Sequence, residues 1–333
     1  MPLKALYDLP APAKLNRFLH VIGRRADGYH LLQSVFVLID WADRLHIERR
    51  SDGRLLRHDL GPTLPADDLC LRAARALQAA SGTHWGADIH IDKQLPWGAG
   101  LGGGSSDAAT VLLALNRLWG LDWPRGQLAK IGLQLGADVP FFIGGHNALV
   151  EGIGERLTPM RVVPCTYAVI KPPVNIATRD IFEHPKLVRD TAAVIVTGSF
   201  GGLVSESGDG KQGIGLLAQE RSQDPAKWSA DFGKNDLQLA AEERWPEVAQ
   251  AVGWLGARFG NSRMTGSGSA VFATIGAPIG LFSGAAVGAE VIIKSGTAEP
   301  PLAAFPVDEL PAGWVGRMCR GLEDHPLAGW ASD

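Results

Sequence analysis

The sequence predicts a globular chain that contains both helices and strands in two closely packed domains. Its 333 residues exceed what a single hydrophobic core usually serves. Segments with alternating apolar residues, typical of strands, are interspersed with segments whose apolar residues recur at helical spacing. The composition changes at residues 171–174, where two prolines follow a lysine. We therefore expect a first domain over residues 1–164 and a second, with an extended tail, over residues 165–333.

The charge balance argues against a polyanionic partner. The net charge is −3 and the isoelectric point is near 6.3, so we expect neither a nucleic-acid surface nor an anionic-membrane surface. No apolar run reaches the roughly 18 residues of a membrane span. The stretch before Ala11 holds no long apolar core of the kind found in signal peptides. These features predict a cytoplasmic protein.

The cysteines also favour a reduced compartment. Cys70, Cys165 and Cys319 are widely separated and form no C-x-x-C pair, which indicates neither a disulfide framework nor a zinc site. The 41 glycines are concentrated in a few loops. They form no low-complexity tract, so the composition is that of a globular protein.

Local patterns place the secondary structure along the chain. Strands are expected over residues 10–21, 35–39, 45–47, 89–91, 150–153, 167–170 and 270–273. Helices are expected over residues 69–80, 108–119 and 128–135, and within residues 235–254. Asp67 or Asp68 is positioned to cap the first of these helices. Residues 197–215, rich in Gly and Ser without periodicity, predict a surface excursion.

A glycine-rich stretch over residues 95–107 stands directly before the expected helix 108–119. Glycine lets backbone N–H groups approach a ligand without obstruction by a Cβ, and a helix N-terminus adds unpaired donors and a positive dipole end. Ser105, Ser106 or Asp107 is expected to cap the helix, which should stop at Gly120. This pattern predicts a binding site for phosphate.

Other interpretations of the loop are weaker. A flexible linker would not place two hydroxyl groups at a helix start, and a P-loop requires a lysine that is missing here. Gly98 to Gly103 satisfies the dinucleotide fingerprint G-x-G-x-x-G, with Asp122 as the acidic partner. That motif should follow a strand directly, whereas Pro96 and Trp97 intervene. An NAD-dependent oxidoreductase therefore remains the less favoured class of enzyme.

Asp138 is a functional candidate from its surroundings alone. It stands between apolar neighbours in Gly-Ala-Asp-Val-Pro-Phe-Phe, residues 136–142. A carboxylate is costly to bury unless it is paired. We therefore expect Asp138 to have a specific partner or a chemical role.

The glycine-rich stretch resembles the ATP-phosphate loop of the GHMP superfamily, which is named for galactokinase and for homoserine, mevalonate and phosphomevalonate kinases. The matching residues read Leu-Pro-x-Gly-Ala-Gly-Leu-Gly-Gly-Gly-Ser-Ser-Asp-Ala-Ala from position 95. The resemblance covers roughly residues 10–273 and implies an α+β fold of two domains, with the active site in the cleft between them. It also implies ATP and Mg²⁺ as cofactors. The nucleotide-binding positions that it implies are Lys93, Pro96, Gly98, Gly100, Leu101, Gly102, Gly103, Gly104, Ser105 and Ser106.

Two further motifs supply the implied catalytic residues. Pro-Ala-Lys-Leu-Asn at residues 12–16 matches the first superfamily motif, in which the lysine lies beside the acceptor hydroxyl and the asparagine contacts substrate. These roles pass to Lys14 and Asn16, and the segment around Asp138 matches the one that supplies the catalytic aspartate. No protein side chain can be assigned to Mg²⁺ with the same support, although the Ser106 hydroxyl is well placed at a helix start. Asp68 stands where the superfamily usually carries an asparagine near the adenine, so its contact with ATP is left open.

The substrate is implied by Asp-Gly-Tyr-His at residues 27–30. This motif is similar to the one in superfamily members that phosphorylate the 2-hydroxyl of 4-diphosphocytidyl-2-C-methyl-D-erythritol, in the non-mevalonate pathway of isoprenoid biosynthesis. The resemblance implies that Tyr29 stacks on cytosine, that His30 bonds to the base edge, and that Phe182 forms the opposite side. Backbone amides of the third motif, Gly266, Ser267 and Gly268, would close the site. Another small-alcohol kinase of mevalonate or homoserine type is the nearest alternative.

Overall fold

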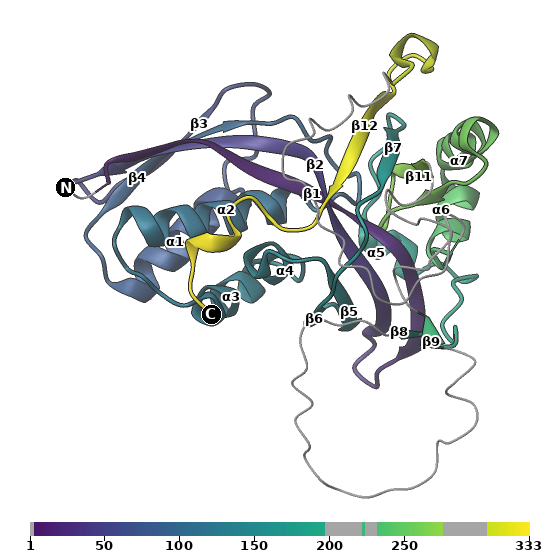
Figure 1. Cartoon of the computed structure of the whole chain (residues 1–333), viewed down its shortest axis with the longest axis horizontal. Helices are drawn as coiled ribbons and strands as arrows, with labels where there is room; N and C mark the ends of the chain where they lie inside the picture. Colours follow the sequence, from purple (N-terminus) through teal and green to yellow (C-terminus); the bar gives the residue numbers. More distant parts are fainter. Residues whose placement is uncertain (1–2, 197–221, 224–231, 276–304) are drawn as a thin grey trace, which may run out of the picture.

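The computed structural model describes residues 3–196, 222–223, 232–275 and 305–333 (Figure 1). Two long antiparallel strands, β1 (Ala5–Arg24) and β2 (His30–Arg50), run through the length of the molecule. In the described part they belong to a ten-stranded sheet with the order β10-β11-β7-β12-β2-β4-β3, while β1 and β5 also pair with β2 and β6 pairs with β5. The expected surface excursion over residues 197–215 lies outside the described residues, as does the start of the tail.

The remaining strands are short. Their bounds are β3 Leu55–Asp59, β4 Gly86–Asp92, β5 Ala148–Gly152, β6 Arg156–Pro159, β7 Thr166–Lys171, β8 Ile195–Val196, β9 Ser222–Gln223, β10 Arg263–Met264, β11 Val271–Ile275 and β12 Val315–Leu322. The strands expected from alternating apolar residues are therefore present in the described chain, most of them longer than predicted. The two strands expected over residues 35–39 and 45–47 form the single strand β2. It continues through Asp43 because that carboxylate finds buried partners.

Four helices cover one face of the first half of the sheet: α1 (Leu69–Ser81), α2 (Gly103–Leu118), α3 (Arg125–Leu135) and α4 (Val139–Gly144) (Figure 1). α2 lies at the centre and is buried on nearly every side, because its first three turns carry small and aliphatic residues. The predicted cap of α1 is confirmed, since Asp68 Oδ1 accepts from the Leu71 N–H over 3.1 Å. The helices and strands of this half share one apolar core.

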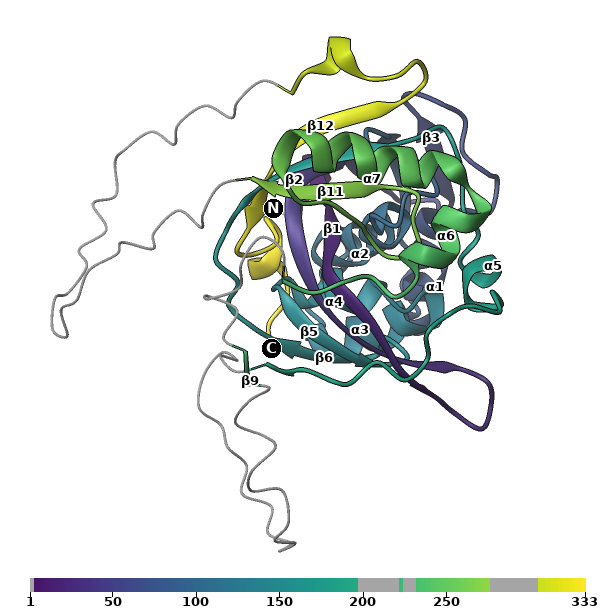
Figure 2. The ribbon, with the colours of Figure 1, turned by 90° about the vertical axis from the view of Figure 1, so that its right-hand side faces the viewer.

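The second half is built around β7 and β11, with α6 (Gln238–Arg244) and α7 (Pro246–Phe259) on one side of them (Figure 2). A single helix region was expected over residues 235–254. It divides at Trp245, which adopts an extended conformation, because Pro246 has no N–H to continue the ladder and instead starts α7. A short helix, α5 (Thr178–Phe182), follows β7 in the chain, and its last residue stacks on His30 at the start of β2.

β12 was not predicted, yet it joins the two halves. It pairs with β7 from Val315 to Arg320 and with β2 at Gly321 and Leu322, both antiparallel. The chain after β12 returns to the helices of the first half, where Arg125 donates to the carbonyls of Ala328 and Ala331. One sheet thus continues across the expected boundary at residues 164 and 165, and the division into two domains stays a prediction.

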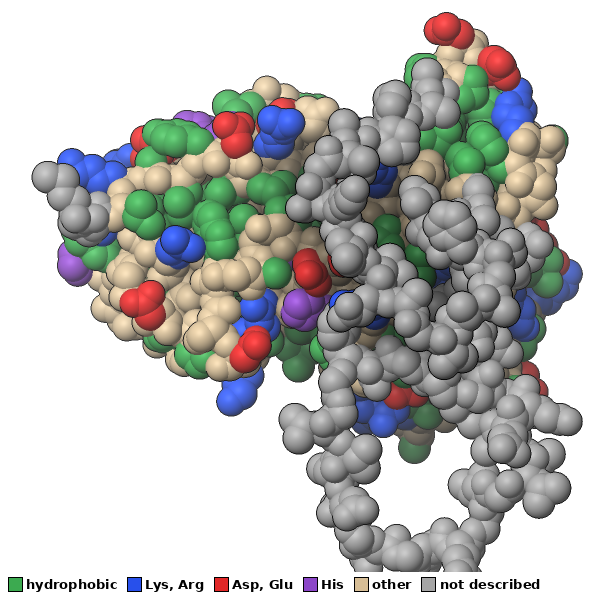
Figure 3. Space-filling view, in the orientation of Figure 1, with side chains coloured by type: hydrophobic (Ala, Val, Ile, Leu, Met, Phe, Trp, Pro, Cys, Tyr) green, Lys and Arg blue, Asp and Glu red, His purple; other side chains and the backbone are tan. Residues whose placement is uncertain are grey.

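On the face shown in Figure 3, acidic and basic side chains are interspersed outside the grey atoms. Among the described helices, none is both long and apolar enough to cross a membrane.

Candidate active site

The glycine loop runs from the end of β4 to α2, and its conformation explains its glycines. Gly98, Gly100 and Gly102 have φ values of 59°, 72° and 74°, in the left-handed region that side chains rarely adopt. Gly102 precedes the first helical residue, so Ser105, Ser106 and Asp107 lie inside α2 and do not cap it. The predicted cap is therefore wrong, because a left-handed glycine can start the helix three residues earlier. The N–H groups of the first turn remain open to a ligand.

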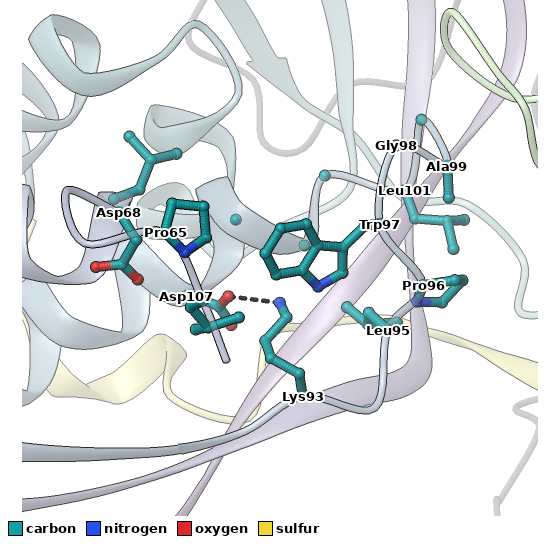
Figure 4. Close-up of a pocket in the computed structure, with 16 residues that line it drawn as sticks. Pro65, Asp68, Lys93, Leu95, Pro96, Trp97, Gly98, Ala99, Leu101 and Asp107 are labelled. Carbon is teal, nitrogen blue, oxygen red and sulfur yellow. Dashed lines mark hydrogen bonds and ion pairs between the residues drawn. The ribbon is translucent and has the colours of Figure 1, made fainter. Parts of the chain in front are cut away.

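This loop forms the wall of a cavity of about 330 Å³ (Figure 4). Of the predicted nucleotide-binding residues, eight line it: Lys93, Pro96, Gly98, Gly100, Leu101, Gly102, Gly103 and Gly104. Ser105 and Ser106 do not line it. Ser106 is fully buried, and its Oγ has no hydrogen-bond partner in the described part of the chain.

Sequence reasoning missed the apolar part of the same cavity. The Trp97 side chain is 44% exposed although it is a large aromatic, and it lies in the cavity together with Leu64, Pro65 and Leu69. Flat apolar walls of this kind fit an aromatic ring system. The signal in the sequence was a tryptophan inside a glycine loop, where core packing does not require one.

Lys93 lies at the base of the cavity between two buried carboxylates. Its Nζ contacts Asp43 and lies 2.7 Å from Asp107 Oδ2. Burial lowers the pKa of Lys93, but the two carboxylates outweigh this effect and raise it. Burial also raises the pKa of Asp107 well above its usual range. Asp43 Oδ1 accepts from the N–H groups of Gln94 and Leu95, so the cluster fixes the start of the glycine loop.

Lys14 and Asp138 meet beside the loop. Lys14 Nζ lies 3.6 Å from Asp138 Oδ2, and the side chains are 4% and 30% exposed. Burial lowers the pKa of Lys14, and the attraction of Asp138 offsets only part of this. The backbone N–H of Lys14 donates to Leu101 O over 2.9 Å. The loop and the lysine are therefore fixed relative to each other, and the partner expected for Asp138 is Lys14.

Asn16 links this pair to the third motif. Its Oδ1 accepts from Lys14 Nζ at 2.7 Å, and its Nδ2 donates to Ser34 Oγ at 2.9 Å. The backbone N–H of Asn16 donates to Thr265 Oγ1. Gly266, Ser267 and Gly268 follow Thr265 and line a second cavity of about 310 Å³ together with Lys14, Asn16 and Asp138. Polar groups from four segments therefore converge on one small space.

A third, larger cavity of about 950 Å³ contains Tyr29, His30 and Phe182. Tyr29 is 61% exposed. The rings of His30 and Phe182 are stacked, with centroids 4.9 Å apart and planes inclined by 23°. Phe182 thus packs on His30 in this structure, and its expected position opposite Tyr29 across a base stays a prediction.

The three cavities adjoin one another. The first and second share Gly98, Gly100 and Gly102, and the second and third share Leu32, Ile153, Thr178 and Phe182. Lys14 and Asp138 line the middle one. A molecule in the first cavity and another spanning the second and third would therefore meet at this pair. The loop does not follow a strand directly, because β4 ends at Asp92, so the arrangement does not support a dinucleotide fold.

Known kinases are similar to this chain in sequence. The sequence model of the family described as GHMP kinases N terminal domain matches residues 68–146. The chain is 56% identical over 332 residues to 4-diphosphocytidyl-2-C-methyl-D-erythritol kinase of Methylibium petroleiphilum, covering 99% of this chain and all of that protein. It is 52% identical to the enzyme of that name from Variovorax paradoxus, with 99% of this chain and all of that protein covered.

Solved structures of kinases are similar to this chain in fold. A crystal structure of 4-(cytidine 5'-diphospho)-2C-methyl-D-erythritol kinase is 34% identical with a TM-score of 0.62, covering 80% of this chain and 89% of that chain. A mevalonate kinase structure, 15% identical, has a TM-score of 0.54 and covers 80% of this chain and 91% of that one. The second likeness concerns the fold alone, and it extends well beyond the N-terminal segment matched by the family model.

Proposed function

Since the chain belongs to the family of 4-diphosphocytidyl-2-C-methyl-D-erythritol kinases, we propose that it transfers the γ-phosphoryl group of ATP to the 2-hydroxyl of that cytidyl alcohol. The observation that carries this proposal is the Lys14–Asp138 pair in the middle one of three adjoining cavities. The first cavity has the glycine loop and helix N-terminus that suit a nucleoside triphosphate. The third has the aromatic and histidine side chains that suit cytosine.

The nucleotide is held by backbone more than by side chains. The open N–H groups at the start of α2 and the dipole of that helix favour the phosphates. Trp97 provides a flat face for the adenine. Lys93 is already engaged by two carboxylates, so its contribution is mainly to hold the loop from below.

Asp138 and Lys14 have different roles at the reacting hydroxyl. Asp138, at the more exposed side of the pair, accepts the hydrogen bond of the substrate hydroxyl and takes its proton as the new phosphate bond forms. Lys14 is nearly enclosed and adjoins Gly102, so its charge stabilises the phosphoryl group during transfer. An anionic nucleotide beside Lys14 favours the charged amine, which offsets the effect of burial on its pKa.

The family implies Mg²⁺, and the residues fit a cation that is bound mainly by the nucleotide. Within the described residues, no group of three histidine, cysteine or acidic side chains is arranged to hold a metal. The Ser106 hydroxyl is a buried oxygen without a partner in the described chain, but it does not line the nucleotide cavity, so no protein ligand is assigned to the ion. When bound, Mg²⁺ neutralises charge on the phosphates.

A coupled assay of ADP release tests the proposal. The full chain with ATP, Mg²⁺ and the cytidyl alcohol should release ADP in proportion to the alcohol consumed. Mevalonate and homoserine, offered separately at the same concentration, should give only the background rate. ADP formation on mevalonate alone, with none on the cytidyl alcohol, would reject the proposed substrate and leave a kinase of another specificity.

A further inference from the structure

The third cavity contains an arginine that the proposed mechanism does not use. Arg189 follows α5, and its Nε donates to His30 Nε2 over 3.1 Å. Its other nitrogens donate to backbone carbonyls, namely that of Leu187 at 2.9 Å and those of Phe182 and His184 at 3.2 and 3.1 Å. The guanidinium therefore connects the start of β2 to the end of α5. All three of its nitrogens are engaged within the protein.

This contact decides where His30 carries its proton. A guanidinium can only donate, so Nε2 of His30 must accept, and a neutral ring then carries its hydrogen on Nδ1. Burial and the charges of Arg189 and Arg24 lower the pKa of His30, which favours the neutral ring. Phe182, stacked on the ring, limits its rotation. No hydrogen-bond partner of Nδ1 is found among the described residues, so this N–H is available to a ligand in the cavity.

We propose that Arg189 is a positioning residue that makes the site selective for cytosine, by holding His30 with a fixed N–H donor at Nδ1. This inference rests on the proposed function. On its pairing edge, cytosine has an acceptor at N3, where uracil has an N–H. A fixed N–H donor at Nδ1 can bond to N3 of cytosine. Against uracil it would face the N3–H, and two donors cannot form a hydrogen bond with each other. Arg189 would thus determine base selectivity without contacting the base.

The other charged groups that line this cavity do not share the role. Arg24 donates from Nε to the Gly28 carbonyl, and Arg179 pairs with Glu183 at 2.6 Å. Asp27 pairs with Arg25 at the turn before Tyr29. Among the described contacts, none of these groups is hydrogen-bonded to His30. Arg179→Gln is therefore a matched control. It removes an arginine from the same cavity but leaves the hydrogen bond from Arg189 to His30 in place.

The tautomer can be measured without any substrate. We would record long-range ¹H–¹⁵N spectra of the full chain with ¹⁵N-labelled histidine near pH 7.5, assigning His30 by its loss in His30→Asn. The parent and Arg179→Gln should show the hydrogen on Nδ1, and Arg189→Gln should show a mixture with Nε2–H. A parent ring protonated on Nε2 would overturn the inference whatever the enzyme activity.

Kinetics then separates a proton effect from a loss of structure. At pH 8, Arg189→Gln should raise KM for the cytidyl alcohol about tenfold to a hundredfold, leave KM for ATP unchanged, and reduce the preference over the uridine analogue. At pH 6 the loss should be smaller than at pH 8, because removing Arg189 takes away one of the causes that lower the pKa of His30, burial and Arg24 being the others, and a protonated ring donates from Nδ1 whichever tautomer the neutral ring adopts. The parent and Arg179→Gln should show no such pH dependence.

Two kinetic outcomes contradict the inference. KM for the cytidyl alcohol could be unchanged in Arg189→Gln, or it could rise equally at pH 6 and pH 8, as expected if the arginine only holds α5 in place. A parent that turns over no cytidyl alcohol would instead refute the proposed function. The spectra of the parent would still decide whether Arg189 fixes the tautomer.

Discussion

Lys14 Nζ and Asp138 Oδ2 lie 3.6 Å apart, the lysine almost enclosed and the carboxylate partly open to the cavity. They come from β1 and from the residue that precedes α4, so only the fold brings them together. Because they adjoin the glycine loop on one side and the acceptor cavity on the other, they are expected to act as one unit.

Asp138→Asn should lower kcat by about 10²- to 10⁴-fold, because the amide keeps the shape but cannot take the hydroxyl proton. KM for either substrate should change little. Lys14→Met should cause a comparable loss, and the double variant should be hardly worse than either single one, since residues that act as a unit are not additive. Asp308→Asn, an exposed aspartate in a short 3-10 helix, is the control. If the kcat losses of the two single variants multiplied fully in the double variant, as measured in steady-state assays, the two residues would act independently.

The pH dependence of kcat/KM should show a limb that belongs to Lys14. Burial lowers the pKa of this lysine below 10.5, so in the free enzyme it loses its proton at a lower pH than an ordinary lysine does. Since the charged form is the active one, kcat/KM should fall as pH rises through that pKa. In Lys14→Arg the limb should vanish, because the guanidinium stays charged. An unaltered limb in that variant would assign it to another group.

Gly100→Ala should disable the loop, whereas Gly104→Ala should be tolerated. A Cβ on Gly100 would lie 2.3 Å from the Thr265 carbonyl oxygen, at a φ of 72°. A Cβ on Gly104 meets only Leu69 at 3.5 Å, an ordinary contact inside a helix. We expect the first change to lower the free energy of unfolding by at least about 1 kcal/mol and to weaken ATP binding. Urea denaturation and nucleotide titration would test this, and equal effects of the two variants would contradict it.

Trp97→Ala should raise KM for ATP by about three- to tenfold, the loss expected for one aromatic stacking contact. KM for the cytidyl alcohol should stay the same, because the indole lines only the first cavity among those that form the site. Trp97→Phe should recover most of the affinity. If alanine at this position left KM for ATP unchanged, the adenine would have to bind elsewhere.

Lys93→Met should destabilise the protein strongly, by about 3–5 kcal/mol, because it leaves two buried carboxylates without their cation. Adding Asp107→Asn to that variant should recover part of the stability, because the amide is neutral at every pH, whereas the buried Asp107 carboxyl group must take up a proton to become neutral. Thermal and denaturant unfolding of the single and double variants would measure the coupling. If the second change lowered stability further, the three residues would not form an electrostatic cluster.

Local patterns were enough for most of the fold. The apolar spacing of α1, α2 and α3 predicted those helices, and the positions near β1, β4, β7 and β11 alternate as strands do. β12 was missed because it follows a long stretch rich in Gly and Pro, and its place between β7 and β2 depends on pairing with distant strands. The cap of α2 was wrong because a left-handed glycine competed successfully with two serines and an aspartate.

The site required more than local patterns. Lys14, Tyr29 and His30 were named because their motifs resemble those of a known superfamily, whereas Asp138 was also a candidate because a carboxylate between apolar residues is costly to bury. Asp43 was not singled out, although it is buried against Lys93. Arg189 was not singled out at all, because its contacts with His30 and with α5 arise only in the folded chain. Buried ion pairs and ring contacts between distant residues leave no periodic trace in a sequence.

The position of β12 also bears on the order in which the protein is made. Its residues, 315–322, emerge from the ribosome after every other described strand, yet they lie in the middle of the sheet between β7 and β2. Until then β7 presents an unpaired edge over Thr166–Lys171, and β2 lacks a partner on this side at Leu38 and Ile39; an unpaired edge is a surface prone to join another chain. The nascent protein therefore cannot complete its central sheet during most of translation. The open edge is covered only when β12 has been synthesised and pairs with it.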